Sequence, residues 1–158
     1  MRIRNMVIDD YAQVYNIWLE SGNGLNDVDD SRVGIEKYLS RNPSTCFVAE
    51  DNGKIIGTIL SGHDGHRGRI GHTAVLASER KKGVGSALIN AAVDALKSEG
   101  ITKASLLVFS RNDTGNKFWG KMGFTDRRDV IYRDKVLLEV NRINDDFKFE
   151  NNSMGELI

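Results

Sequence analysis

The sequence predicts a single domain of mixed α/β class, with a mostly antiparallel central sheet and helices that flank it. The turn signal Asp51-Asn52-Gly53 lies between two strand-forming runs, and Asn-Gly turns favour antiparallel hairpins. Residues 69–109 then have the order strand, glycine-rich turn, helix, apolar strand, which is the order of a parallel crossover. A chain of 158 residues, 40% of them apolar, has the size and the core of one domain.

The first third of the chain predicts one strand and two helices. Residues 2–6 alternate polar and apolar side chains, as a half-buried strand does. An aspartate at its first position can cap a helix over 9–20. The next helix begins at Asp30 or Ser31 and ends before Pro43, because the residue that precedes a proline disfavours helical backbone.

The middle of the chain predicts four strands and one long helix. The strands cover residues 45–50, 54–61, 69–76 and 104–109. The helix over 86–99 connects the last two, and its apolar positions recur at helical spacing. The run from Ala104 to Phe109 is almost wholly apolar, so we expect this strand at the centre of the sheet.

The last part predicts a short helix, a hairpin and a tail. The helix covers about 114–122, and strands over 124–132 and 135–142 pair through Arg133-Asp134. We expect the domain to end at residue 143. Residues 144–158 are rich in Asn, Asp, Glu and Ser, which predicts a tail that is mobile or that orders only on docking a partner.

The most informative stretch is residues 80–87, Arg-Lys-Lys-Gly-Val-Gly-Ser-Ala, between the third of these strands and the long helix. The first N–H groups of a helix have no internal partner and carry partial positive charge. Gly83 and Gly85 lack a Cβ, so an oxyanion can approach the backbone closely. Three basic side chains precede Gly83. The stretch therefore predicts a cradle for a phosphate or pyrophosphate.

Comparison with known phosphate-binding loops narrows the class of ligand that this loop could bind. The nucleotide P-loop places its lysine after the glycines, whereas here the basic residues come first. The dinucleotide fingerprint needs a third glycine where this chain has Leu88. The pattern Arg-x-x-Gly-x-Gly after a strand instead resembles the coenzyme A pyrophosphate loop of the GNAT superfamily, the GCN5-related N-acetyltransferases. Residues 112–124, which begin with Asn and close with Gly-Phe, resemble the second signature of that family.

The resemblance covers roughly residues 1–142, and it implies a fold in which the fourth and fifth strands splay apart. Here those strands would be 69–76 and 104–109, with acetyl-coenzyme A in the gap. By resemblance, the backbone near Val75 would bond the pantetheine arm and the acetyl carbonyl, and Asn112 would bond the arm from the other side. The cofactor-binding residues that the resemblance implies are Ala74, Val75, Arg80, Lys81, Lys82, Gly83, Val84, Gly85, Ser86, Asn112 and Trp119.

The implied function is transfer of an acetyl group from acetyl-coenzyme A directly to a primary amine of a small molecule or protein. The general base and acid are less defined by the resemblance. His72 is either the base or a structural strand histidine. Trp119 stands where many members carry an acidic tyrosine, and indole cannot titrate, so we expect it to pack. Tyr132 is then our candidate acid, with Ser110 as an alternative.

An alternative function is a coenzyme A-binding sensor or interaction module with little catalysis. Trp119 and Arg69 motivate it, because they stand where family members often carry reactive groups. The acceptor pocket should be formed by residues 21–30, the second helix and the last hairpin. Three aspartates in that first segment could attract a cationic amine or could simply cap a helix: Asp27, Asp29 and Asp30.

Composition limits the partners. The net charge is zero and no recognition motif is present, so we expect no nucleic-acid partner. No apolar run is long enough for a membrane span, and Cys46 is the only cysteine, which favours a reducing, cytoplasmic setting. We interpret Cys46 as a core thiol. The histidines and aspartate of 62–68 favour a polar hairpin over a metal site, and a homodimer stays open.

Overall fold

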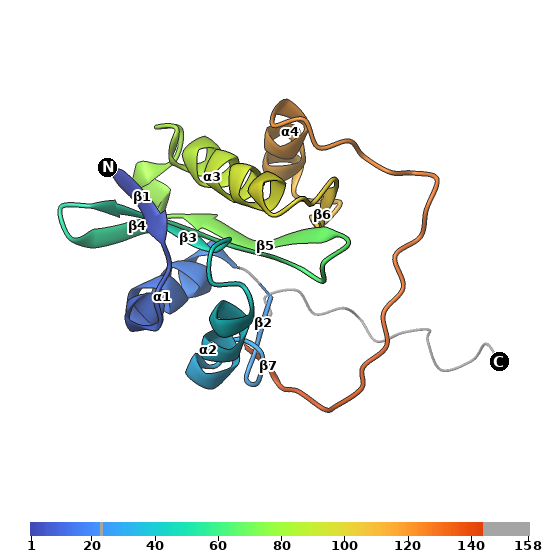
Figure 1. The fold of residues 1–158 in the computed structure, drawn as a ribbon, viewed down its shortest axis with the longest axis horizontal. Helices are drawn as coiled ribbons and strands as arrows, with labels where there is room; N and C mark the ends of the chain where they lie inside the picture. Colours follow the sequence, from blue (N-terminus) through green and yellow to red (C-terminus); the bar gives the residue numbers. More distant parts are fainter. Residues whose placement is uncertain (23, 144–158) are drawn as a thin grey trace.

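The computed structural model describes residues 1–22 and 24–143 and has three layers (Figure 1). Helices α1 (Tyr11–Ser21) and α2 (Arg32–Arg41) lie on one face of a central sheet, and α3 (Val84–Ser98) and α4 (Asp113–Lys121) lie on the other. The strands are β1 (Arg2–Asn5), β2 (Leu25–Asn26), β3 (Phe47–Asp51), β4 (Lys54–His63), β5 (Gly68–Val75), β6 (Ala104–Leu106) and β7 (Arg142–Ile143).

The central sheet has the order β1-β3-β4-β5-β6, and only the β5–β6 pair is parallel. The predicted hairpin is confirmed, since Asp51 pairs with Lys54 across a two-residue turn. Asn52 and Gly53 have φ angles of 48° and 77°, and this left-handed geometry matches the twist of an antiparallel ribbon. The mixed, mostly antiparallel fold class that the sequence predicts is therefore confirmed.

The core has two parts, one on each face of the sheet. Trp18 and Val14 of α1 are fully buried against the sheet, together with Ile35 of α2. On the other face, Leu88 and Ala92 of α3 are fully buried against the opposite side of the same strands. The sheet therefore has little freedom to shift between its two helical layers, which holds the ends of its strands in fixed positions.

The predicted central position of 104–109 is wrong. β6 comprises three residues and is the last strand of the sheet, with β5 as its only strand neighbour in the described part of the chain. Beyond it, Leu107 and Phe109 are exposed. The apolar composition correctly predicts a strand in this segment. A strand is central, however, only when a second strand pairs with its other edge.

The predicted hairpin of 124–132 and 135–142 is also absent from this structure. Only Arg142–Ile143 forms a strand, β7, which pairs with β2 in a separate two-stranded ribbon. We call residues 125–141 the arm; it is extended, and every residue in it is exposed (Figure 1). Alternating apolar residues form strands only where a partner edge is available. The tail that the sequence predicts after residue 143 lies outside the described residues.

An arginine bridge fixes the start of the chain to the sheet. Arg4 on β1 donates two hydrogen bonds to the carboxylate of Asp10, at 2.7 and 2.8 Å, and one to Glu50 on β3 at 2.7 Å. Burial acts to raise the pKa of Asp10, but the hydrogen bonds from Arg4 and from the Val7 N–H outweigh it, so this pKa lies below its usual value. The folded state therefore favours the charged carboxylate.

The lowered pKa makes a prediction about acid stability. A carboxyl group whose pKa is lower in the folded than in the unfolded state stabilises the fold at pH values above its unfolded-state pKa. This contribution is lost as the pH falls through its folded-state pKa. Asp10→Asn should lower the unfolding free energy by about 2 kcal/mol at pH 7, and by progressively less below about pH 4. Urea denaturation at several pH values measures this difference.

The neighbouring Asp9 supplies a matched control. Its side chain is 91% exposed, and its ion pair with Arg32 is long, at 3.6 Å, so it should contribute little to stability. Asp9→Asn should change stability by less than about 0.5 kcal/mol. Equal effects of the two substitutions, or a loss at Asp10 that does not depend on pH, would contradict the assigned role of the bridge.

Candidate active site

The glycine-rich loop joins the end of β5 to the start of α3, as the sequence predicts. A short 3₁₀ turn, η2 (Ala77–Glu79), leads into it, and Gly83 occupies the N-cap of α3 with a φ of 84°. That left-handed backbone is open to glycine and unfavourable for other residues. The N–H groups of Val84, Gly85 and Ser86 then form the first turn of a helix of 15 residues and have no acceptor within it.

The basic side chains of the loop are differently placed. Arg80 Nε donates to the carbonyl of Val75 at 3.1 Å, which ties the guanidinium to the end of β5. Lys82 forms an ion pair with Glu79 at 3.1 Å, while Lys81 is exposed and adopts a φ of 62°. Two positive groups therefore lie near the helix N-terminus, and the third is partly neutralised. The arrangement suits an anionic ligand at the N-terminus of α3.

Strands β5 and β6 part before β5 reaches this loop. They pair in parallel at three positions only, the last of which joins Ile70 to Leu106. β5 continues to Val75, and its other edge stays paired with β4, at Thr58 with Ala74 and at Gly57 with Val75. Beyond Ile70, the β6-facing edge of β5 has no strand neighbour in the described part of the chain. The splayed pair predicted by the family resemblance is confirmed.

His72 lies in this unpaired part of β5 with a strained backbone. Its φ is 46°, and the register between β4 and β5 shifts between Thr58 and Leu60, next to this residue. Trp18 Nε1 donates to the His72 carbonyl at 3.3 Å, and the two rings meet edge to face, 4.8 Å apart. Bulges redirect side chains, and strained backbone that is held by its surroundings often marks a functional position.

The imidazole of His72 faces a buried carboxylate. His72 Nε2 is 2.7 Å from Asp30 Oδ1, close enough for an ion pair but without hydrogen-bond geometry. Only 5% of the Asp30 side chain is exposed, against 28% for His72. The second Asp30 oxygen accepts the Asn26 N–H at 2.7 Å, and Tyr11 donates to the Asp30 carbonyl at 2.8 Å. The carboxylate is thus fixed, and His72 Nε2 is buried against it, while other atoms of the His72 side chain are exposed.

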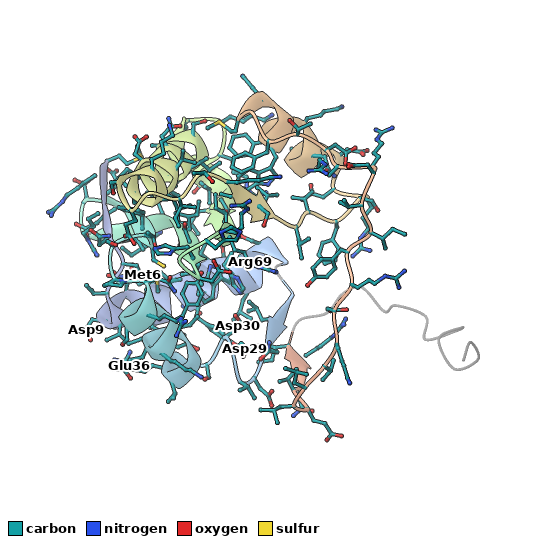
Figure 2. The ribbon with its side chains drawn as sticks, turned by 45° about the vertical axis from the view of Figure 1, so that its right-hand side comes forward. Met6, Asp9, Asp29, Asp30, Glu36 and Arg69 are labelled. Carbon is teal, nitrogen blue, oxygen red and sulfur yellow. The ribbon has the colours of Figure 1, made fainter. Side chains whose placement is uncertain are left out.

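The other predicted acidic residues have separate roles. In Figure 2, Asp29 and Asp30 lie on the segment between β2 and α2. Asp29 accepts from the Asn26 side chain at 2.9 Å, and Asp27 accepts two bonds from Asn141 at the end of the arm. The helix cap is Ser31, whose Oγ accepts the Gly34 N–H at 3.0 Å. Of the three aspartates, Asp30 is the one that faces His72.

The second signature forms α4 and the turn before it. Asn112 caps this helix, with its side-chain oxygen accepting the Gly115 N–H at 2.9 Å. Trp119 is half-buried and packs edge to face against Phe124, with ring centres 5.1 Å apart. Phe118 lies over the loop side of α3, since a Cβ on Gly85 would come within 3.2 Å of its ring. The second signature therefore holds α4 against the start of α3.

Three other residues discussed in the sequence analysis lie apart from the His72–Asp30 pair. Tyr132 lies in the arm, 57% exposed, and the structure does not bring it into contact with His72. Arg69 lies where β5 still pairs with β6, before the strands diverge. Cys46 is buried under the sheet, where burial raises the pKa of its thiol to about 11. The role of Tyr132 as an acid stays a prediction, and Cys46 has the environment of a core thiol.

The segment 62–68 forms the predicted polar hairpin between β4 and β5. Asp64 Oδ1 accepts the N–H groups of His66 and Arg67, both at 2.7 Å, and so holds the turn. His63 Nε2 is 2.5 Å from Glu99 at the end of α3. Within residues 1–22 and 24–143, no group of three or more His, Cys, Asp or Glu side chains converges as a metal site would, and no helix is long and apolar enough to cross a membrane.

A sheet whose two last strands part before a glycine-rich loop and the N-terminus of a long helix is the arrangement of an acetyltransferase fold. The acetyltransferase (GNAT) family model matches residues 11–124, so the chain belongs to that family. An acetyltransferase of Sodalis glossinidius is 32% identical over 139 residues, covering 88% of this chain and 97% of the relative. One of Photorhabdus laumondii is 33% identical over 141 residues, covering 88% and 98%.

Solved structures agree on the fold. The Ard1 protein of Thermoplasma volcanium is 26% identical and superposes with a TM-score of 0.71, covering 78% of this chain and 82% of that one. A Mycobacterium tuberculosis protein in complex with CoA is 18% identical with a TM-score of 0.66, covering 80% and 73%. The second likeness shows the shared fold alone.

The pairing of His72 with Asp30 was not predicted from the sequence. The two residues are 42 positions apart, and no motif links them. The available signals were His72 as the titratable residue nearest the loop on its strand and an acidic segment assigned to the acceptor pocket. Neither signal specifies a contact. The contact between His72 and Asp30 depends on the irregular backbone of β5 and on how Trp18 packs against that strand.

The geometry of the loop makes a prediction about anion binding. Ser86 is the third residue of α3, where glutamate is well tolerated by a helix, so Ser86→Glu should fold normally. Its carboxylate would occupy and repel the anion site. Saturating acetyl-coenzyme A should raise the melting temperature of the native chain by about 5–10 °C and that of Ser86→Glu by less than about 1 °C.

Asn90→Glu is the matched control, because it adds the same charge to the exposed side of the same helix. This variant should keep the full thermal shift. An undiminished shift in Ser86→Glu would contradict anion binding at the helix N-terminus.

Proposed function

We propose that this protein transfers an acetyl group from acetyl-coenzyme A directly to a primary amine, with His72 as the general base. The observation that carries the proposal is the unpaired edge of β5, which leads through η2 and the glycine-rich loop to the N-terminus of α3. A pyrophosphate bound at that terminus would direct the rest of the cofactor along this edge. Membership of the acetyltransferase family supports the same assignment.

Coenzyme A would be held mainly by backbone groups. The N–H groups of Val84, Gly85 and Ser86 would bind the pyrophosphate, and Arg80 and Lys81 would border it. The pantetheine arm would lie along Ala74 and Val75 in place of a neighbouring strand. When bound, acetyl-coenzyme A supplies the thioester whose carbonyl the amine attacks.

His72 would prepare the amine for that attack. An alkylammonium has a pKa of about 10.4, so at pH 7 roughly one molecule in a thousand or fewer is the neutral nucleophile. The His72 imidazole can take one proton from the ammonium, and Asp30 at 2.7 Å would stabilise the imidazolium. The neutral nitrogen then bonds to the acetyl carbon, and it loses its second proton to solvent as the amide forms. The carbon–sulfur bond then breaks, and the thiolate takes a proton, for which Tyr132 is the proposed donor.

The base assignment is tested by substitution. His72→Gln should lower kcat about 10²–10⁴-fold while acetyl-coenzyme A still raises the melting temperature, because the base and the phosphate loop are separate groups. Asp30→Asn should lower kcat by a smaller factor, about tenfold, because the imidazole remains. Release of free thiol from acetyl-coenzyme A, followed across a panel of amines, measures the rate.

His63→Gln supplies the matched control, since this histidine lies at the hairpin and pairs with Glu99 at the end of α3, not with Asp30. Its kcat should stay within about twofold of the native value. Full activity in His72→Gln would overturn the base assignment. Thermal stabilisation by acetyl-coenzyme A with no turnover on any amine would favour the sensor alternative.

Direct transfer makes a further prediction about Cys46. This thiol is 1% exposed, donates to the Ser61 carbonyl at 3.2 Å, and has a pKa raised to about 11 by burial. A neutral, buried thiol is a poor nucleophile. Cys46→Ala should therefore keep its kcat at a temperature where it is folded, while losing about 1–2 kcal/mol of stability.

Intact-protein mass spectrometry after mixing with acetyl-coenzyme A alone measures the intermediate. No acetylated enzyme should accumulate before an amine is added. A burst of acetyl-enzyme, or loss of turnover in correctly folded Cys46→Ala, would contradict direct transfer.

A further inference from the structure

Arg69 is an unpaired positive charge on the face of β5 that looks toward α2. Its side chain is exposed, and within residues 1–22 and 24–143 it forms no ion pair or hydrogen bond. Gly62 of β4 lies directly opposite it in the sheet, and a Cβ on Gly62 would come within 2.7 Å of the Tyr38 hydroxyl of α2. Directly opposite residues face the same side of a sheet, so the Arg69 side chain leaves the strand beside Tyr38.

Gly71, two residues further along β5, leaves open space on the same face. It pairs with Leu60 of β4, whose side chain is buried in the core under α1 and α2. A Cβ placed on Gly71 would nevertheless meet no atom within 4 Å. The backbone of Gly71 lies outside the left-handed region, so its conformation does not itself require glycine. The missing side chain leaves this part of the strand uncovered.

The backbone irregularity of β5 brings His72 to this face as well. Ile70 belongs to the core under α3, and strict alternation along the strand would turn residue 72 toward α3 too. The His72 ring instead packs on Trp18 of α1. Arg69, Gly71 and His72 therefore line one face of β5 in that order. Three residues of strand span about 10 Å, with the open space over Gly71 between the two charged ends.

The surroundings of Arg69 suit an oxyanion. The Tyr38 hydroxyl makes no hydrogen bond within the described part of the chain. Burial raises the pKa of this phenol to about 12, against an opposing effect of the Arg69 charge, so the hydroxyl stays protonated and can donate. The carboxylate of Asp30 does not neutralise Arg69, because its two oxygens already face His72 and the Asn26 N–H.

We propose that the acceptor is a small amine that also carries an oxyanion group, with its amine at His72 and its oxyanion at Arg69. This inference rests on the proposed function, because it names the acceptor class of the same site. The guanidinium presents N–H donors in a planar fork that matches a carboxylate or a phosphate, and the Tyr38 hydroxyl can add one more donor. At the other end, the Asp30 carboxylate behind His72 favours the ammonium form that arrives from solvent.

The two ends of this face therefore match the two charges of a zwitterion, such as an amino acid or an amino-alkyl phosphate. A polyamine or an amino sugar with several ammonium groups fits less well, since a second positive group would lie near Arg69 and be repelled. The charge pattern thus selects among amines that the acetyl-transfer chemistry alone would treat alike.

The first test compares acceptors that differ mainly in the oxyanion. β-Alanine is paired with β-alaninamide, and ethanolamine phosphate with ethanolamine. In each pair, the charged member should have a kcat/KM at least about tenfold higher, because it gains charge-assisted hydrogen bonds. The neutral member has the less basic amine, so basicity cannot produce this preference. The pair with the larger ratio identifies the oxyanion as carboxylate or phosphate.

The second test removes the cation. Arg69→Gln should lower kcat/KM for the charged acceptors at least about tenfold, mainly through KM, and leave the neutral ones within about twofold. Arg69→Lys should keep part of the preference, since it keeps the charge and loses the fork. Arg67→Gln is the matched control, because Arg67 is also exposed but bonds the His66 carbonyl in the hairpin. It should keep the full preference.

The third test fills the open space. Gly71→Val should raise KM for both members of each pair, because it closes the face regardless of charge. The added Cβ itself has room, and valine favours strands. An unchanged thermal shift with acetyl-coenzyme A shows that each variant is folded and still binds the cofactor. Native KM values in correctly folded Gly71→Val would contradict an acceptor at this position.

Binding without transfer separates this inference from the proposed function. In the ¹⁵N-labelled native chain, β-alanine or ethanolamine phosphate should shift the Gly71 amide, and neither should do so in Arg69→Gln. These shifts without turnover on any amine would contradict the proposed function alone. Turnover on other amines without these shifts, equal kcat/KM within each pair, or a preference that survives in Arg69→Gln would overturn the oxyanion site.

Discussion

The parting of β5 from β6 after Ile70 is the constraint on which the rest of the site depends. A parallel strand that ran alongside β5 to Val75 would occupy its backbone groups and leave no room for an extended ligand. Because β4 still pairs with Ala74 and Val75 on the other edge, the end of β5 is held in place while one side is free. The same strand leads into the loop that places the N-terminus of α3, so the free edge and the anion site share one rigid support.

A second consequence of this strand is the position of His72. The register shift against β4 and the φ of 46° turn the imidazole toward Asp30, and Trp18 holds both the carbonyl and the ring. Most of these contacts come from α1 and from the segment before α2, which form one helical layer of the fold. The proposed cofactor-binding groups of the helix N-terminus, in contrast, belong to α3 on the other face. The two reactants of a transfer reaction would therefore meet at the sheet from opposite layers.

How much could be predicted from the sequence depended on the range of the interactions. The Asn52-Gly53 turn, the Ser31 cap and the end of α2, and the loop before α3 are specified by neighbouring residues, and all appear in the structure. The predicted cap of the first helix is wrong, because Asp9 lies in a 3₁₀ turn, Ile8–Asp10, and α1 begins at Tyr11 without a side-chain cap. The contact between His72 and Asp30 is long-range and depends on backbone irregularity, so no local pattern predicted it. The arm shows a different limit. Its alternating residues favour strands, but a strand forms only where its backbone pairs with a neighbouring strand, and residues 125–141 pair with none in this structure.

The central claim is that coenzyme A binds along the free edge of β5 and against the first turn of α3. Nuclear magnetic resonance of the ¹⁵N-labelled chain, titrated with acetyl-coenzyme A, tests it most directly, because it reports each backbone N–H separately. The account predicts the largest shifts at the amides of Val84, Gly85 and Ser86, together with those of Ala74 and Val75. Saturating ligand that left these amides unchanged, or that moved a different part of the surface, would contradict it.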